Sequence, residues 1–192
     1  MRSNNLVVEV CMRLFILLII SVLVSGCFFL NDVNPFSTPD EFLANRATPP
    51  AERAIVIFGL SVEGPGYHAI TRWFSVHMDE YSIERQSITG NCWRSNNMEA
   101  KVPGIIGTRQ YFSFDVKPGY YVSREFLDAS DKNLVFEVPA GRVVYLGEFV
   151  WTSESRIGLK RDPSTVKSYF GGDVLLANTR QVSQVTGILC GP

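Results

Sequence analysis

Short apolar or alternating segments recur roughly every dozen residues between Ala54 and Trp151, separated by turns rich in glycine and proline. The first, residues 54–60, is continuously apolar, as is typical of a strand buried on both faces. Residues 110–116 alternate between apolar and polar side chains, which indicates a strand with one buried face. A series of such strands in a chain of 192 residues predicts a mainly β domain, an antiparallel β-sandwich.

Four further segments have strand-like patterns. Residues 69–77 alternate, 81–89 form a polar edge strand, and 134–138 and 142–151 are apolar strands. In the last of these, period two predicts one shared face for Val143, Tyr145, Gly147, Phe149 and Trp151. Pro118 and Gly119 suit the two corners of a type II turn, so a hairpin is expected from 110–116 into 120–126.

The C-terminal part departs from this rhythm. Asp162 is a good N-cap, Pro163 suits the first helical position, and two glycines follow residue 170. These signals predict a short helix at 163–170. Residues 173–190 begin with an apolar run that fits either a helix or a strand, and a helix is expected.

An apolar segment near the N-terminus, residues 14–24, has the layout of a secretory signal peptide. Arg13 precedes it, and the small residues Ser25 and Gly26 follow it. A membrane-spanning helix would need about 20 apolar residues, which residues 14–30 reach only if 25–27 are counted. An uncleaved anchor and a buried helix therefore remain alternatives. Glu9 is unusual in such a leader, so translation could also start at Met12.

Residues 24–27, Val-Ser-Gly-Cys, resemble the lipobox of bacterial lipoproteins. The resemblance implies cleavage between Gly26 and Cys27, a diacylglycerol on the Cys27 thiol, and a fatty acid such as palmitate on the new amino group. Residues 1–26 would then be the signal peptide and 27–52 a lipidated, proline-rich flexible tether, with a short helix near 37–45. Residues 53–192 would form the sandwich domain.

Two cysteines lie within the expected domain, Cys92 and Cys190. In an oxidising compartment an even pair forms a disulfide most simply, and that is the prediction. The alternative is two buried thiols, because the sequence does not show whether the two Cα atoms come within bonding range.

The segments YFSFDVKPGYYVSREF and NLVFEVPAGRVVYLGEFVW carry a second resemblance. They are similar to the DUF2846-like, prealbumin-like domains of exported bacterial lipoproteins, which pair two hairpins of this kind. The similar region is 111–151. It implies a small antiparallel sandwich on a lipid anchor, and the family offers no established catalytic residues to transfer.

Several function classes are disfavoured. A formal net charge of −1 with no basic run argues against nucleic-acid binding. The chain has no nucleophile-elbow or phosphate-loop motif, so an enzyme is not expected. His77 and Asp79 could share a strand face, but two histidines in all make a zinc site improbable, and neither metal nor cofactor is expected. The sequence leaves open whether two carboxylates lie close enough together to act as a glycosidase-like pair. The candidates are Asp115, Glu125, Asp128, Asp131 and Glu137.

Aromatic residues are the remaining candidates for binding, and Trp73, Trp93 and Tyr121 are the positions expected to contact a partner or ligand. The predicted function is a non-enzymatic, membrane-anchored envelope lipoprotein whose sandwich contacts another envelope component, such as an envelope protein. The alternative is a lipoprotein that binds a small ligand or glycan through exposed aromatics. Phe28, rather than Asp, follows Cys27, which favours the outer membrane facing the periplasm, or the cell surface.

Overall fold

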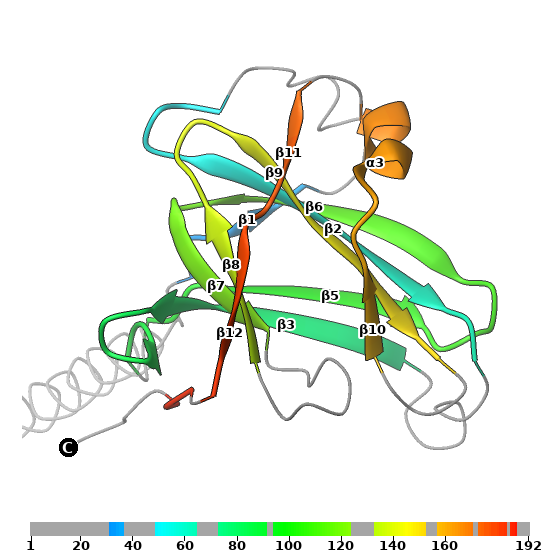
Figure 1. Cartoon of the computed structure of the whole chain (residues 1–192), viewed down its shortest axis with the longest axis horizontal. Helices are drawn as coiled ribbons and strands as arrows, with labels where there is room; N and C mark the ends of the chain where they lie inside the picture. Colours follow the sequence, from blue (N-terminus) through cyan, green and yellow to red (C-terminus); the bar gives the residue numbers. More distant parts are fainter. Residues whose placement is uncertain are drawn as a thin grey trace, which may run out of the picture.

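Two β-sheets pack face to face with the main hydrophobic core between them, as Figure 1 shows. The computed structural model describes residues 31–36, 49–64, 73–91, 94–123, 133–152, 157–170, 173–183 and 185–187. The predicted mainly β sandwich with one short helix is confirmed. The expected signal segment lies outside the described residues. Within the part that is described, no helix has the length and apolar character needed to cross a membrane.

The first sheet, named here the β2 sheet, has the order β1-β6-β2-β9-β10, and β11 also pairs with β9. Its strands are β1 (Asn34–Pro35), β2 (Ala54–Val62), β6 (Arg109–Val116), β9 (Val143–Trp151), β10 (Ile157–Lys160) and β11 (Val174–Leu176). The second, the β3 sheet, has the order β12-β8-β7-β3-β4, and β5 also pairs with β3. Its strands are β3 (Trp73–Ser82), β4 (Ser87–Ile88), β5 (Asn97–Pro103), β7 (Gly119–Ser123), β8 (Asn133–Val138) and β12 (Thr179–Val182).

The β2 sheet is mixed, so the prediction of a wholly antiparallel sandwich is wrong in this respect. β9 runs parallel to both β2 and β11, whereas the described pairs of the β3 sheet are antiparallel. The cause is the connectivity. The chain travels from β2 to β9 by way of β6 and two excursions into the β3 sheet, and it reaches β11 from β9 through β10 and α3, so neither parallel pair is a hairpin. Residues 54–60 lie in β2, and every residue of that strand is buried, as its continuous apolar run predicted.

The core between the sheets is rich in aromatic side chains. The Phe58 ring stacks on Phe114 with 5.4 Å between centroids and meets the edge of Phe149 at 5.9 Å. Smaller clusters cover the outer faces. The helix α3 (Pro163–Phe170) places Val166 against Ile57 on the outer face of the β2 sheet. Apolar side chains are thus buried between the sheets and on the outer face of each sheet, which explains how a thin sandwich accommodates so many of them.

The turn at Pro118 and Gly119 does not form the predicted hairpin. β6 belongs to the β2 sheet and β7 to the β3 sheet, so the chain crosses between the sheets here. Gly119 has φ 153°, far from the roughly +80° that a type II turn requires at this position. The backbone twist of type I and type II turns also does not match the right-handed twist of two hairpin strands. Such strands are joined more often by the mirror-image turns I′ and II′. The Pro139–Gly141 turn likewise links the two sheets, from β8 to β9.

A β-bulge in β9 overturns the predicted shared face of Val143–Trp151. The register between β2 and β9 shifts at Ile57/Phe58, where Tyr145 pairs with Ile57 and Gly147 pairs with Phe58. Before the bulge, Tyr145 packs on the α3 side; after it, Phe149 faces the core between the sheets. One extra residue exchanges the faces because the side-chain period of a strand is two.

The C-terminal helix is confirmed within its predicted bounds. Asp162 caps α3 by accepting hydrogen bonds from the Ser164 backbone N–H (2.9 Å) and hydroxyl (2.8 Å). The helix expected at 173–190 is wrong over its described part, where β11 pairs with β9 and β12 pairs with β8. The chain crosses between the sheets at Ala177 and Asn178, whose backbones bond to Tyr145 and Glu137. Long-range pairing therefore decides a segment whose local pattern was ambiguous.

Candidate functional site

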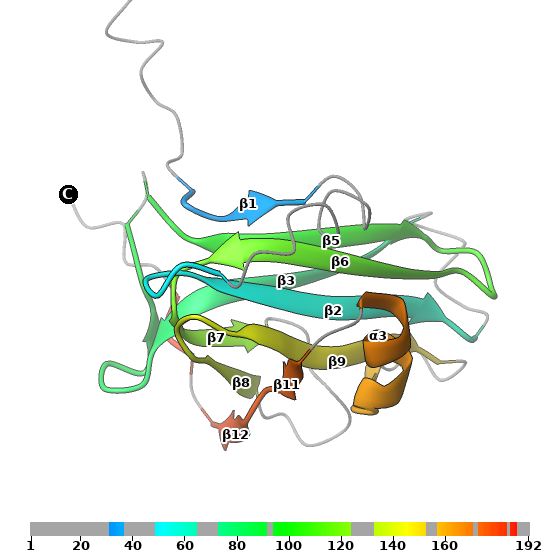
Figure 2. The ribbon, with the colours of Figure 1, turned by 90° about the horizontal axis from the view of Figure 1, so that it is seen from above.

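The segment directly after the expected lipid attachment point is docked on the sandwich, and residues 31–36 are named here the strap. Figure 2 shows its strand, β1, against the side of the molecule formed by β5 and β6. Asn34 and Pro35 pair with Asp115 and Phe114 of β6, and Val33 is buried in the core between the sheets. The prediction of a flexible tether is therefore wrong for residues 31–36, which belong to the folded domain. Residues 37–48 lie outside the described part.

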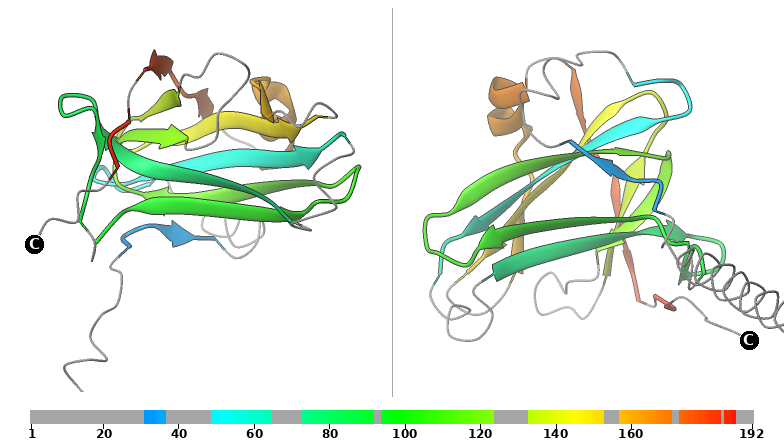
Figure 3. Two further views of the ribbon diagram at one scale, coloured as in Figure 1. Left: turned by 90° about the horizontal axis from the view of Figure 1, so that it is seen from below. Right: turned by 180° about the vertical axis from the view of Figure 1, so that it is seen from behind.

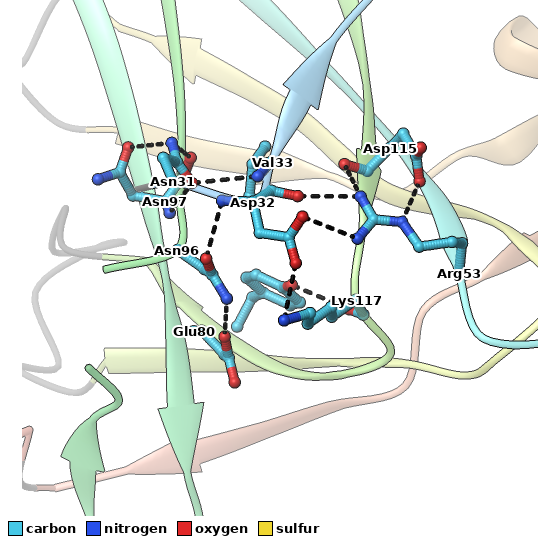
Figure 4. Close-up of polar contacts among 10 residues, drawn as sticks. Asn31, Asp32, Val33, Arg53, Glu80, Asn96, Asn97, Asp115 and Lys117 are labelled. Atoms are coloured by element: carbon cyan, nitrogen blue, oxygen red, sulfur yellow. Dashed lines mark hydrogen bonds and ion pairs between the residues drawn. The ribbon is translucent and has the colours of Figure 1, made fainter. Parts of the chain in front are cut away.

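Asparagine side chains fasten the strap to the other sheet. The Asn31 amide nitrogen donates to the Asn97 carbonyl at 2.9 Å, and the Asn97 N–H donates back to Asn31 Oδ1 at 3.2 Å. The Asp32 N–H donates to Asn96 Oδ1 at 3.0 Å, while the amide nitrogen of Asn96 donates to Glu80. The strap thus bonds to β5 of one sheet and β6 of the other, and it closes the sandwich along one side (Figure 4).

Arg53 joins the strap to the start of β2 and the end of β6. Its Nε donates to Asp115 Oδ1 at 2.8 Å, and its Nη2 donates to the carbonyl oxygens of Asp32 (2.9 Å) and Asp115 (3.0 Å). The planar guanidinium can serve several acceptors at once, which a lysine cannot do in the same geometry. Only 16% of the Arg53 side chain is exposed, so these bonds are partly shielded from water.

The Asp32 carboxylate lies between two cations, Lys117 at 2.7 Å and Arg53 at 3.5 Å. The hydrogen bond from Lys117, followed by the charges of Lys117 and Arg53, lowers the pKa of Asp32 below its ordinary value of 3.8. The strap contact of Asp32 is therefore present above pH 3.8 and is lost as pH falls through the lowered pKa.

Acidification below pH 4 is expected to loosen the strap before the sandwich unfolds. Amide hydrogen exchange at Phe36, whose N–H bonds to the Ser113 carbonyl, measures this opening. Asp32→Asn is expected to raise the exchange rate at neutral pH and to flatten its pH dependence between pH 5 and 3 once intrinsic exchange is subtracted. An unchanged pH profile in Asp32→Asn would show that another carboxylate controls the strap.

Tyr121 was predicted to contact a partner or ligand, and the structure contradicts this. Its side chain is fully buried in the core, and its hydroxyl donates to the Lys117 carbonyl at 2.9 Å. Burial raises the pKa of this hydroxyl far above its usual range, so it remains a donor. The contact to a backbone carbonyl four residues upstream is similar to the tyrosine corner of immunoglobulin-like sandwiches, and it fixes the crossing from β6 to β7.

Tyr121→Phe is expected to lower the free energy of unfolding by about 1–2 kcal/mol, because it leaves the Lys117 carbonyl without its donor. Urea denaturation followed by circular dichroism measures the change. Tyr145→Phe is the matched control, since Tyr145 is comparably buried and the same single oxygen is removed there, in the cluster on the α3 side of the β2 sheet. Equal losses in both variants would rule out a specific role for the Tyr121 hydroxyl.

Trp73 is exposed, at the end of β3 where the loop from β5 to β6 carries two exposed isoleucines. Trp73 is the first residue of β3 and pairs with Pro103, the last residue of β5. Ile105 and Ile106 follow in the loop to β6, and the exposed fractions are 53% for Trp73, 66% for Ile105 and 56% for Ile106. These three residues are named here the apolar end. Loop isoleucines gave no signal in the sequence, because an isolated apolar pair has no periodicity.

The remaining described candidates lie in ion pairs and hydrogen bonds. His77 Nε2 is 3.2 Å from Glu99, and Lys101 contacts the same carboxylate oxygen. Glu137 accepts a hydrogen bond from Asn178 at 3.0 Å. Asp115 accepts a hydrogen bond from Arg53, as described above. Over the described residues, no group of His, Cys, Asp and Glu side chains could hold a metal ion.

A second polar cluster, missed in the sequence, covers the outer face of the β2 sheet. Arg109 Nε donates to the buried Glu148 at 2.9 Å, and Lys160 contacts Glu63. Gly59 makes room for the cluster, because a Cβ there would lie 2.8 Å from the Tyr111 ring. A glycine inside an apolar strand was the available signal. Each carboxylate contacts a cation, an arrangement that supports a structural network rather than acid–base catalysis.

The other predicted site residues, Gly26, Cys27, Cys92, Trp93 and Cys190, lie outside the described residues. The disulfide between Cys92 and Cys190 therefore stays a prediction, as does the lipid on Cys27. So does any contact by Glu125, Asp128 or Asp131, which also lie outside the described ranges.

Comparisons with family models, with curated proteins and with solved structures found no match to this chain. The similarity of residues 111–151 to DUF2846-like domains stays a prediction. The strap and the apolar end are therefore the features from which a function can be argued.

Proposed function

We propose that this chain is a bacterial envelope lipoprotein, anchored by lipid on Cys27, whose β-sandwich contacts another component of the envelope without catalysing a reaction. The docked strap is the observation that carries the proposal. Asn31 bonds to β5 only four positions after Cys27. Four extended residues span at most about 14 Å, so lipid on Cys27 would hold the sandwich against the membrane surface.

The strap also makes this attachment short. A flexible tether of 26 residues would let the domain move through a wide volume. Docking at Asn31 limits the distance between Cys27 and the domain to about 14 Å at most, because the strap bonds to both sheets. Several acyl chains on one cysteine anchor a protein stably, whereas a single chain does so only marginally.

The apolar end is the surface that this proposal assigns to the contact, whether the component is a protein or the bilayer itself. Ile105 and Ile106 are the most exposed large apolar side chains of the described residues. The alternative of ligand binding through aromatics is weaker, because Tyr121 lies in the core and Trp73 extends from the end of a strand. The outer membrane facing the periplasm, or the cell surface, is the location that we propose.

Growth with a radioactive fatty acid tests the anchor. The protein is expected to be labelled, and Cys27→Ser is expected to lose the label and to accumulate as uncleaved precursor. Cys11→Ser is the matched control and is expected to keep the label, because Cys11 lies within the predicted signal peptide. A label that persists in Cys27→Ser would refute the proposed lipidation.

A further inference from the structure

The strap and the apolar end lie at opposite ends of the same two strands. Asn31 bonds to Asn97, the first residue of β5, and Trp73 pairs with Pro103, the last. β6 starts just after the apolar end and finishes at the residues that pair with β1. Figure 3 shows β5 and β3 side by side, and both strands run the length of the molecule. One side of the sandwich therefore carries both features.

The loop of the apolar end is held in one conformation by its own backbone. The Thr108 N–H donates to the Ile105 carbonyl at 3.0 Å, and the Gly107 N–H donates to the Val62 carbonyl at 2.8 Å. Gly107 has φ 88°, as position i+2 of a type II turn requires. These bonds fix the turn, so the exposure of Ile105 and Ile106 is a property of the fold.

We propose that the apolar end inserts into the same bilayer that carries the lipid on Cys27. This inference rests on the proposed lipidation. The membrane would meet the domain at two points, and the β5–β6 side would lie along its surface. The six-residue rise from Asn97 to Pro103 separates the two points by about 20 Å. The chain from Cys27 to Asn31 spans at most about 14 Å, so the strap stays near the membrane surface. The apolar end can then reach the lipid.

The chemistry of the apolar end favours a lipid surface over an anionic or polar partner. Isoleucines suit the acyl region, and tryptophan is enriched at the membrane interface. The nearby cations face carboxylates, with Arg109 on Glu148 and Lys101 on Glu99. The contact is therefore apolar rather than electrostatic, and it should change little with salt concentration.

The test uses the whole mature protein, purified from membranes and placed in phospholipid vesicles. These vesicles contain lipids with a nitroxide on the acyl chain. An environment-sensitive fluorescent amino acid replaces Ile106 in one sample and Leu175 in the control. Leu175 is 38% exposed and lies in β11, which pairs with the start of β9, whereas Val62, which bonds to the loop of the apolar end, pairs with the last residue of β9. Quenching is expected to be at least about threefold stronger at position 106 than at position 175.

Mass spectrometry of the same samples separates this inference from the proposed function. Lipid on Cys27 with equal, weak quenching at both positions would overturn the inference and leave the lipoprotein proposal intact. A processed chain without lipid would overturn the proposal itself. Fluorescence that shifts to the blue in native membranes, but not in vesicles, would show that a protein covers the apolar end, and this also overturns the inference.

Discussion

Arg53→Ala is expected to lower the free energy of unfolding by about 3 kcal/mol, because it removes one partner from a partly buried ion-pair network. Arg53 bonds to the Asp115 side chain, the Asp115 carbonyl and the Asp32 carbonyl. Without it, the two carboxylates lose a cation and two backbone oxygens lose a donor. The strap should then leave β6 and withdraw Val33 from the core, while the rest of the core between the sheets stays packed.

Urea denaturation gives the total loss, and hydrogen exchange at Phe36 locates it in the strap. Arg53→Lys is the matched variant: it keeps the charge but not the planar donor geometry, so about half of the loss is expected. A double-mutant cycle with Asp115→Ala should show coupling of at least about 1 kcal/mol. Additive losses, with unchanged exchange at Phe36, would contradict the role given to Arg53.

Gly147→Ala is expected to destabilise the protein by a similar amount, about 3 kcal/mol, for a different reason. Gly147 follows Leu146, the extra residue of the β9 bulge, and has φ 135°, a conformation that strains any residue with a Cβ. A Cβ at this position would also lie 2.6 Å from Leu159 Cδ1 and 3.0 Å from the Lys160 carbonyl. The substitution therefore disturbs the contact between β9 and β10 as well as the backbone.

Gly107→Ala separates these two causes. Gly107 also has a positive φ, 88°, but a Cβ there would have no neighbour within 4 Å. Backbone strain alone predicts a loss of about 1 kcal/mol in this control. Thermal unfolding of both variants measures the difference. Equal losses of stability in the two variants would mean that the close contacts of a Cβ at position 147 add nothing to the cost of the strained backbone.

The strands and the helix that could be predicted are those whose signals are local. The apolar run that became β2 and the Asp162-Pro163 start of α3 each carry their information within a few residues. The bulge at Gly147 is a local feature too, but a glycine in a strand predicts only an irregularity and not its direction. For that reason the face occupied by Tyr145 was predicted incorrectly.

The strap could not be predicted because its partners are distant in the sequence. Asn31 and Asn97 are 66 positions apart, and β1 is too short to show a period. Pro35 argued for an extended tether, although proline is also accepted in an edge strand. The Arg109–Glu148 pair, 39 positions apart, was hidden in the same way. Such contacts depend on the order of strands in each sheet, which turn residues alone do not determine.

The intact mass of the mature protein, purified from membranes without reducing agent, tests the central claim most directly. The account predicts a chain that begins at Cys27 and carries a diacylglycerol and an amide-linked fatty acid on that residue. The same spectrum would show whether Cys92 and Cys190 are joined, by a loss of about 2 Da relative to the two thiols. A chain with an unmodified Cys27, or one that retains residues 1–26, would contradict the account.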